Sequence, residues 1–177
     1  SGHDHKNTPY EVRGGVALHT SSVWLFTREM AALEQDCFGD NLHRYHSEIK
    51  GAKLLEKRRL RWAKMMHNMD PLSRRKNCLS FLKKGLKNLS PSKVEFAAFG
   101  QACLCMVHGI FDLLEKYNGK IFACMIPSGI TKPNISYPDY FLSKDKVFLL
   151  QRYYYLLSSQ LQNGLLIMDE TDETQDR

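Results

Sequence analysis

A short apolar run that ends in acidic residues constrains the fold of this chain more than any other feature. Residues 165–168 (Leu-Leu-Ile-Met) lead directly into Asp169 and Glu170, and the helix stop Asn163-Gly164 lies just before them. An apolar stretch of this length that is entered from a helix is typical of a buried strand in a mixed or parallel sheet. Because open α/β sheets bind ligands at the carboxyl ends of their strands, Asp169 is expected at a binding edge.

The remaining patterns predict an α/β order of elements. Strands are expected at residues 10–19 and 120–126, with a short edge strand at 43–50. Helices are expected at 20–38, 51–69, 73–88, 92–117 and 145–162. This order predicts an α/β fold in one domain over residues 1–177, with a helical insertion at 51–118.

Composition excludes several classes of protein. The chain shows no run of about 18 apolar residues and no signal peptide, so no membrane span is expected. The five cysteines are odd in number and form no C-x-x-C pair, which favours reduced thiols in a cytoplasmic protein over disulfides or a zinc site. No P-loop, dinucleotide-binding glycine motif or nucleophile elbow is present.

The positive charge is unevenly spread along the chain. Residues 169–177 hold five acidic residues and one Arg, so the rest of the chain carries 24 Lys and Arg against 14 Asp and Glu. A basic body attracts polyanions through its long-range field, which favours a nucleic-acid partner. Charge that only keeps the chain soluble is the alternative.

Part of this charge is organised along the helix predicted at 51–69. Lys53, Lys57, Arg61 and Lys64 are spaced by four, four and three residues, which places them on one face of a continuous helix. Lys50 lies just before this helix, and a second basic cluster follows at residues 74–87. Such a stripe is able to track a phosphate backbone, and an ordinary solvated helix face is the alternative interpretation.

Glu48 is the candidate partner of Asp169 in a metal site. It lies in the sequence Glu48-Ile49-Lys50-Gly51, at the end of the predicted edge strand. Carboxylates that converge at one edge are the ligands that Mg²⁺ prefers, and two-metal phosphodiester cleavage needs several of them. A surface acid paired with Lys50 or Lys53 is the alternative.

The chain resembles a family on four short motifs. These are Ser1-Gly2-His3-Asp4, Gly14-Gly15-Val16, Glu48-Ile49-Lys50-Gly51 and Leu166-Ile167-Met168-Asp169. On these motifs it is similar to the bacterial and phage proteins grouped as domain of unknown function 3800. The resemblance implies a ribonuclease H-like mixed sheet flanked by helices. The Asp-Glu that precedes the first motif and the C-terminal acidic motif of that family are absent from this sequence.

These observations predict a metal-dependent nuclease or nuclease-like protein. Glu48 and Asp169 are the expected catalytic metal ligands for Mg²⁺ or Mn²⁺, with Glu170 as a further ligand. Five basic residues are expected to orient the nucleic-acid backbone: Lys50, Lys53, Lys57, Arg61 and Lys64. One alternative is a non-catalytic module that binds nucleic acid or a protein partner, and another is an insertion that mediates homo-oligomer contacts. DNA and RNA are not distinguished by the sequence.

Overall fold

The computed structural model describes residues 10–47, 49–127 and 144–167. It divides the chain into two compact units. Leu18–Lys120 forms a helical unit, and the segments Ser1–Ala17 and Ile121–Arg177 together form the other unit. The helical unit therefore includes the predicted helix 20–38 as well as the segment 51–118 that was predicted as an insertion.

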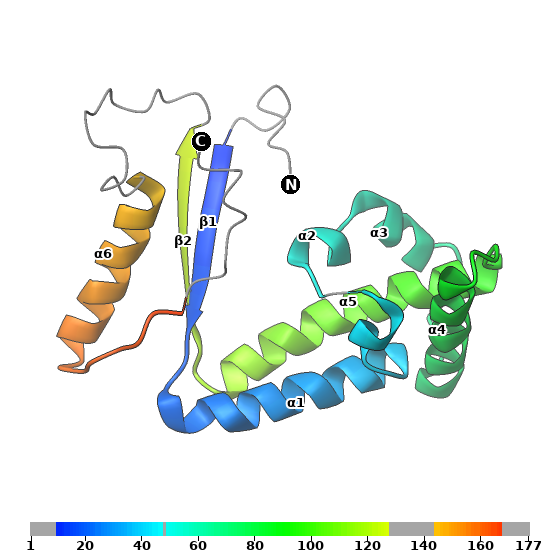
Figure 1. Ribbon diagram of the computed structural model, residues 1–177, viewed down its shortest axis with the longest axis horizontal. Helices are drawn as coiled ribbons and strands as arrows, with labels where there is room; N and C mark the ends of the chain where they lie inside the picture. The colour runs from blue at the N-terminus through cyan, green and yellow to red at the C-terminus, as the bar shows by residue number, and fades with distance from the viewer. Residues whose placement is uncertain (1–9, 48, 128–143, 168–177) are drawn as a thin grey trace. The chain divides into compact units, whose positions relative to one another are not determined.

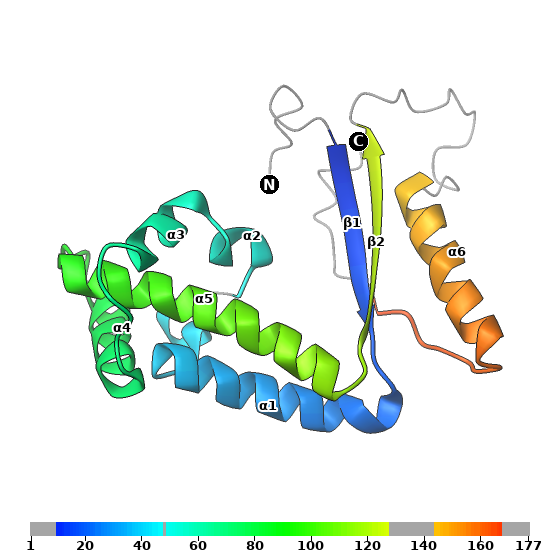
Figure 2. The same ribbon diagram turned by 180° about the vertical axis from the view of Figure 1, so that it is seen from behind.

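The helical unit is built around one long central helix. In chain order its elements are α1 (Thr20–Phe38), the 3-10 helix η1 (Leu42–Tyr45), α2 (Gly51–Leu54), α3 (Lys57–Ala63), α4 (Pro71–Leu86) and α5 (Lys93–Lys116). Both α3 and α4 pack on α5, and α1 contacts α5 and α4. Figures 1 and 2 show α1 and α5 side by side.

Local capping signals set several helix ends where the sequence predicts them. Gly39 ends α1 in a left-handed conformation with φ of 88°, and its N–H donates to the carbonyl of Gln35. Ser92 and Glu95 form a capping box at the start of α5, where the helix over 92–117 is predicted to begin. Thr20 and Ser21 are residue types that favour the N-cap position, but the N-cap of α1 is His19, whose side chain accepts from the backbone N–H of Ser21.

The central helix α5 supplies more of the core than any other described element. Its buried apolar residues are Ala97, Ala98, Phe99, Ala102, Cys103, Met106 and Leu114. Among the described residues, α5 alone is long and apolar enough to cross a membrane by length and composition, and half of that window is buried inside the protein. Core helices of soluble proteins meet the same criterion, so this finding does not assign α5 to a membrane.

The helix predicted over 51–69 is interrupted, which corrects the predicted basic stripe. α2 ends at Leu54 and α3 begins at Lys57, so Lys53 lies on a different helix from Lys57. Both Leu54 and Ala63 are buried, at 3% and 5% exposed. On a continuous helix, nine residues turn the chain by about two and a half turns, which would place these two side chains on opposite sides. The break lets both of them face the core.

The second unit contains two strands and one helix among the described residues. Strands β1 (Tyr10–Ala17) and β2 (Lys120–Pro127) form a two-stranded antiparallel sheet, and α6 (Lys144–Ser159) contacts β1. The ring of Phe122 on β2 packs edge-to-face on Tyr153 of α6, with the ring centroids 6.4 Å apart. The prediction of an α/β fold with a ribonuclease H-like mixed sheet flanked by helices is therefore wrong, because the described part of the chain is mostly helical.

The prediction of a strand at 165–168 is also wrong over residues 165–167, which are the part of this range that the structure describes. Leu165, Leu166 and Ile167 lie outside any strand and are 80%, 43% and 86% exposed. An apolar run becomes a strand only where a neighbouring strand satisfies its backbone groups. Within the described residues, β1 and β2 pair only with each other, so this run has no such neighbour.

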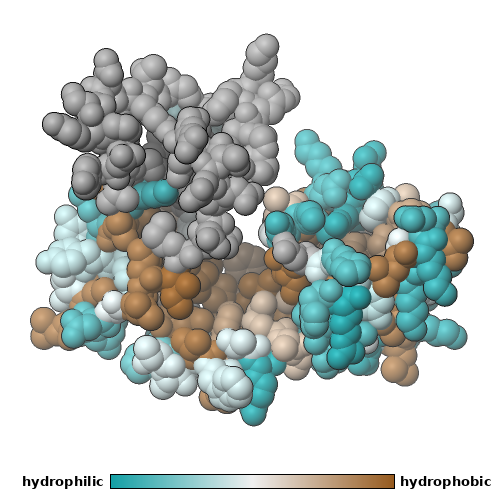
Figure 3. Space-filling view, in the orientation of Figure 1, coloured by the Kyte–Doolittle hydropathy of each residue, from teal (hydrophilic) through white to brown (hydrophobic). Residues whose placement is uncertain are grey.

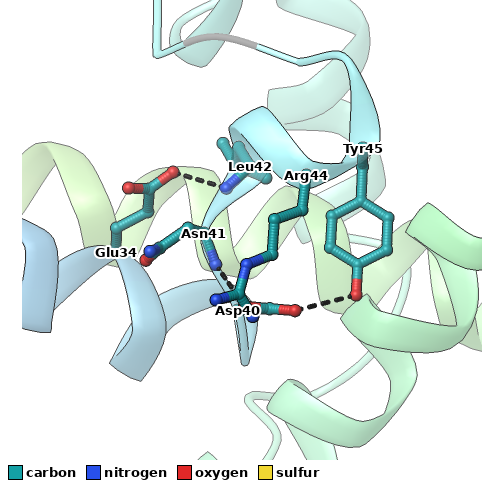
Figure 4. A network of polar contacts seen from close by, with 6 residues as sticks. All are labelled: Glu34, Asp40, Asn41, Leu42, Arg44 and Tyr45. Carbon is teal, nitrogen blue, oxygen red and sulfur yellow. Dashed lines mark hydrogen bonds and ion pairs between the residues drawn. The ribbon is translucent and has the colours of Figure 1, made fainter.

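A polar network closes the turn after α1 and replaces the edge strand predicted at 43–50 (Figure 4). The backbone N–H of Leu42 donates to the carboxylate of Glu34 at 2.6 Å. The carboxylate of Asp40 accepts from the Arg44 guanidinium and from the Tyr45 hydroxyl, both at 3.0 Å. Because Arg44 and Tyr45 must reach back to Asp40, residues 42–45 coil into η1 rather than extend.

Candidate nucleic-acid interface

Basic residues are concentrated between the end of η1 and the start of α5. Residues 50–93 contain 14 Lys and Arg but only two acidic residues, Glu56 and Asp70. More than half of the 25 basic residues of the chain therefore lie in about a quarter of its length. This segment forms α2, α3 and α4, which belong to the same compact unit.

Both acidic residues of this segment already have local partners. The carboxylate of Glu56 lies 3.5 Å from Arg58 and 3.6 Å from Arg59. Asp70 caps α4, because its carboxylate accepts a hydrogen bond of 3.0 Å from the backbone N–H of Ser73. Hydrogen bonds from Ser73 lower the pKa of Asp70. Neither acid is available to neutralise the other cations of the segment.

Eight of the 14 cations point into solvent. They make no ion pair with any residue in the described part of the chain: Lys53, Lys57, Arg61, Lys64, Lys76, Lys83, Lys87 and Lys93. Figure 3 shows hydrophilic residues gathered over α3 and α4 on the face in view. This surface therefore presents a high density of unneutralised positive charge.

Three cations at α3, namely Lys57, Arg61 and Lys64, lie on the side of that helix away from α5. The backbone of α3 approaches α5 at Arg59 and Ala63, where both residues contact the position of Gly100. Lys57 and Arg61 each precede one of these residues by two positions, which turns them to the opposite side of the helix. Lys64, at the end of α3, follows Arg61 by three positions. We call Lys57, Arg61 and Lys64 the α3 basic face.

A missing side chain allows α3 to sit this close to α5. A β-carbon at Gly100 would lie 2.5 Å from the backbone nitrogen of Ala63 and 2.6 Å from the carbonyl oxygen of Arg59. Real β-carbons do not approach backbone atoms so closely, so the seating of α3 requires glycine at this position. The α3 basic face is thus attached to the most buried helix of the unit.

The neighbouring residue Gln101 fastens the end of α3. Its side chain is nearly buried, at 8% exposed, and donates to the carbonyls of Ala63, Met66 and His67 at 3.0 to 3.3 Å. Its oxygen accepts from the N–H of Met69 at 2.9 Å. One amide therefore satisfies carbonyls at the end of α3 and fixes the loop that leads to α4.

Two arginines of α3 contact aromatic rings of the helical unit. Arg59 is only 18% exposed in its side chain, and its guanidinium lies 5.1 Å from the ring centre of Phe99. Arg58 lies 5.2 Å from the ring centre of Trp62. These cation–π contacts let both guanidinium groups pack on apolar rings of the helical unit.

Trp62 belongs to an aromatic cluster that joins α3, α4 and α5. Its ring centre lies 4.5 Å from that of Phe96 on α5 and 6.2 Å from that of Phe81 on α4. Phe81 in turn stacks on Phe99 of α5 at 4.4 Å. The cluster gives the basic helices a common rigid base.

The five predicted backbone-binding residues all lie in the helical unit. Lys50 precedes α2 as its exposed N-cap residue, and Lys53 lies on α2. Lys57, Arg61 and Lys64 come together on α3 as the α3 basic face. Sequence analysis missed Gly100 and Gln101, although a glycine and an amide inside a long apolar helix are the signals that point to such contacts.

The predicted metal ligands Glu48, Asp169 and Glu170 lie outside the described residues. Within the described ranges, no group of three or more His, Cys, Asp or Glu side chains is arranged to hold a metal ion. The Mg²⁺ or Mn²⁺ site thus stays a prediction from the sequence.

No family model matches this chain, and neither a curated protein nor a solved structure is significantly similar to it. Membership of the domain of unknown function 3800 family stays a prediction, while the ribonuclease H-like fold that it implied is contradicted.

Proposed function

We propose that the helical unit binds nucleic acid through the α3 basic face. The observation that carries this proposal is the group of eight exposed cations named above, Lys57, Arg61 and Lys64 among them, which make no ion pair with an acid in the described part of the chain. Phosphate groups are the natural partners of such cations, and binding through them releases counterions from the nucleic acid. This is the non-catalytic alternative of the sequence analysis.

The way α3 is held supports the same proposal. A flexible basic segment would lose conformational entropy on binding, and a rigid one loses less. Gly100, Gln101 and the aromatic ring of Trp62 hold α3 on α5, so Lys57 and Arg61 are presented from a fixed backbone. Contacts of this kind recognise the phosphodiester backbone rather than a base sequence.

Nuclease activity is not part of the proposal. It depends on Glu48, Asp169 and Glu170, and no observation in the described residues favours a cleavage site. Lysine and arginine bind phosphate without a metal ion, so the proposed binding is expected to be indifferent to EDTA.

The test is fluorescence anisotropy with labelled 20-nucleotide single-stranded DNA, duplex DNA and single-stranded RNA, each with EDTA. We expect the double variant Lys57→Gln/Arg61→Gln to bind roughly tenfold more weakly than the unmodified chain, because two phosphate contacts are lost. The matched control is Arg28→Gln/Lys120→Gln, which removes the same charge from exposed residues of the helical unit outside residues 50–93.

Equal weakening in both double variants would show that net charge alone is responsible, which contradicts the proposal. Binding that disappears in EDTA would also contradict it, and would favour the metal site predicted at Glu48, Asp169 and Glu170. Cleavage of the labelled strands on addition of Mg²⁺ or Mn²⁺ would support that same site.

A further inference from the structure

A stripe of three leucines runs along one side of α4. Leu72, Leu79 and Leu86 follow one another at seven-residue intervals. Seven residues make nearly two helical turns, so the three side chains lie on one face of this 16-residue helix. Leu72 is 74% exposed and Leu86 is 47% exposed, while Leu79 is partly buried. We call these residues the α4 leucine stripe.

An open groove of about 570 Å³ lies along the first two of these leucines. Its lining consists of Gly39, Leu72, Arg75, Lys76, Leu79, Ser80 and Lys83. All of these residues belong to the helical unit. The groove therefore lies between α4 and the turn that follows α1.

The wall of this groove is fixed by close backbone packing. A β-carbon at Gly39 would lie 2.9 Å from the side chain of Leu79 and 3.0 Å from the carbonyl oxygen of Arg75. The guanidinium of Arg75 pairs with Asp36 of α1 at 3.1 Å. The hydrogen bonds to Asp40 shown in Figure 4 hold the same turn. The groove is thus part of the folded unit.

The rim of the groove is positive. Lys76 and Lys83 follow Leu72 and Leu79 by four residues each, so they flank the leucine stripe on one side. Both lysines are exposed and pair with no acid in the described part of the chain. In helix pairing, the residues beside an apolar stripe select the partner by opposite charge.

We propose that the α4 groove binds an amphipathic helix of a partner protein, whose apolar stripe is flanked by Asp or Glu. Apolar positions seven residues apart fit the side chains of a second helix, and the two lysines fit acidic flanks. A second copy of this chain is disfavoured, because pairing α4 with itself would bring lysines together. Nucleic acid would meet the lysines but would leave the leucine stripe uncovered.

The test uses a synthetic acidic amphipathic peptide of about 18 residues, which spans five helical turns. It carries Leu at alternating three- and four-residue spacing with Glu beside each Leu, and binding to the whole chain is measured by fluorescence anisotropy. We expect saturable binding that is lost when the same residues are scrambled. A matched peptide with Lys in place of Glu is expected to bind at least about tenfold more weakly, because like charges then face each other.

Variants locate the site on α4. Leu72→Ser is expected to weaken peptide binding about tenfold, and the control Leu89→Ser, at an exposed leucine beyond α4, is expected to leave it unchanged. The double variant Lys76→Glu/Lys83→Glu is expected to lose binding of the peptide with Glu flanks and to bind the peptide with Lys flanks instead. At physiological salt the field of more distant charges is screened, so such a reversal of charge preference indicates that these lysines lie beside the flanks of the peptide.

Absence of saturable binding, or a charge preference that the lysine reversal does not change, would overturn the proposal. A dimer seen by light scattering and abolished by Leu72→Ser would assign the groove to a second copy, which also overturns it. Lys57→Gln/Arg61→Gln serves as a second control, because it is expected to weaken nucleic-acid binding and to leave peptide binding intact. The two proposals can therefore fail separately.

Discussion

Gly100 of α5 lies so close to Ala63 of α3 that a β-carbon on Gly100 would be 2.5 Å from the Ala63 backbone nitrogen. This contact seats the helix that carries the α3 basic face. A small residue at the crossing of two helices allows their backbones to approach, and a larger one forces them apart. The position of the proposed binding surface therefore depends on a buried residue.

Gly100→Ala is expected to lower the free energy of unfolding by about 1–3 kcal/mol, because the added methyl group meets backbone atoms that cannot rotate away. The measurement is urea unfolding followed by circular dichroism. Gly85→Ala is the matched control, since a β-carbon at Gly85 on α4 meets nothing within 4 Å. This control is expected to be stabilising by up to about 1 kcal/mol, because alanine is the better helix former. Equal destabilisation by both variants would contradict the close contact.

Replacement of Gln101 by leucine is expected to destabilise the helical unit by roughly 1–3 kcal/mol. It removes the hydrogen bonds to Ala63, Met66 and His67, and the carbonyl of buried Ala63 loses this donor. Thermal unfolding of the variant is compared with that of Gln35→Leu, at an exposed glutamine on α1. A melting temperature of Gln101→Leu no lower than that of this control would show that the amide does not hold the end of α3.

Acid is expected to destabilise the protein partly through Glu95. Its carboxylate is almost fully buried and accepts from Lys84 at 2.9 Å and from Ser80 at 2.5 Å. The hydrogen bond from Lys84, followed by those from Ser80 and Ser92, lowers the pKa of Glu95 to about 2. Because the pKa is lower in the folded than in the unfolded state, this stabilisation is complete above pH of about 4.5 and is lost as the pH falls towards 2.

The corresponding measurement is the free energy of unfolding between pH 2 and pH 7, for the unmodified chain and for Glu95→Gln. The variant is expected to be less stable at neutral pH and to lose less stability on acidification. Glu115→Gln, at an exposed carboxylate of α5, is expected to leave the pH profile unchanged. An identical acid dependence in Glu95→Gln and the unmodified chain would contradict the role of Glu95.

The buried cysteines are expected to resist modification in the folded protein. Cys78 and Cys103 are fully buried, and burial raises the pKa of Cys78 to about 12 and that of Cys103 to about 11. Because the thiolate is the reactive form, iodoacetamide is expected to label partly exposed Cys124 first and these two only after unfolding. Mass spectrometry of the labelled peptides measures the order, and equally rapid labelling of Cys78 and Cys124 in the native state would contradict the burial of Cys78.

Helices with clear local signals could be predicted from the sequence. The capping box of Ser92 and Glu95 and the helix stop at Gly39 act within one turn of chain, so they do not depend on distant contacts. The strand over 10–17 and the strand after Gly119 were also predicted, since alternating and β-branched residues mark them.

Features that depend on distant residues could not be predicted in this way. The run Leu165-Leu166-Ile167 has the composition of a buried strand, but its state depends on a neighbouring strand that the described residues do not supply. The break between α2 and α3 allows both Leu54 and Ala63 to be buried in the core, which one continuous helix would not. Periodicity within a short window does not contain either constraint.

The charged residues of the candidate interface could be predicted from the sequence, but the contacts that hold them in place could not. Charge density is a local property, so Lys57, Arg61 and Lys64 were identified from their spacing. The contacts that hold α3, at Gly100 and Gln101, join residues more than 30 positions apart. Only the folded chain shows that Gly100 and Gln101 lie beneath α3 and support the α3 basic face.

The most direct test of nucleic-acid binding by the α3 basic face is the salt dependence of the binding constant. For duplex DNA, the logarithm of this constant is expected to fall linearly with the logarithm of salt concentration, with a slope of about −0.9 for each phosphate contact. Lys57→Gln/Arg61→Gln is expected to make the slope shallower by about 1.8, because two contacts are lost. Arg28→Gln/Lys120→Gln is expected to keep the slope of the unmodified chain. A slope that is the same in all three proteins would contradict the account.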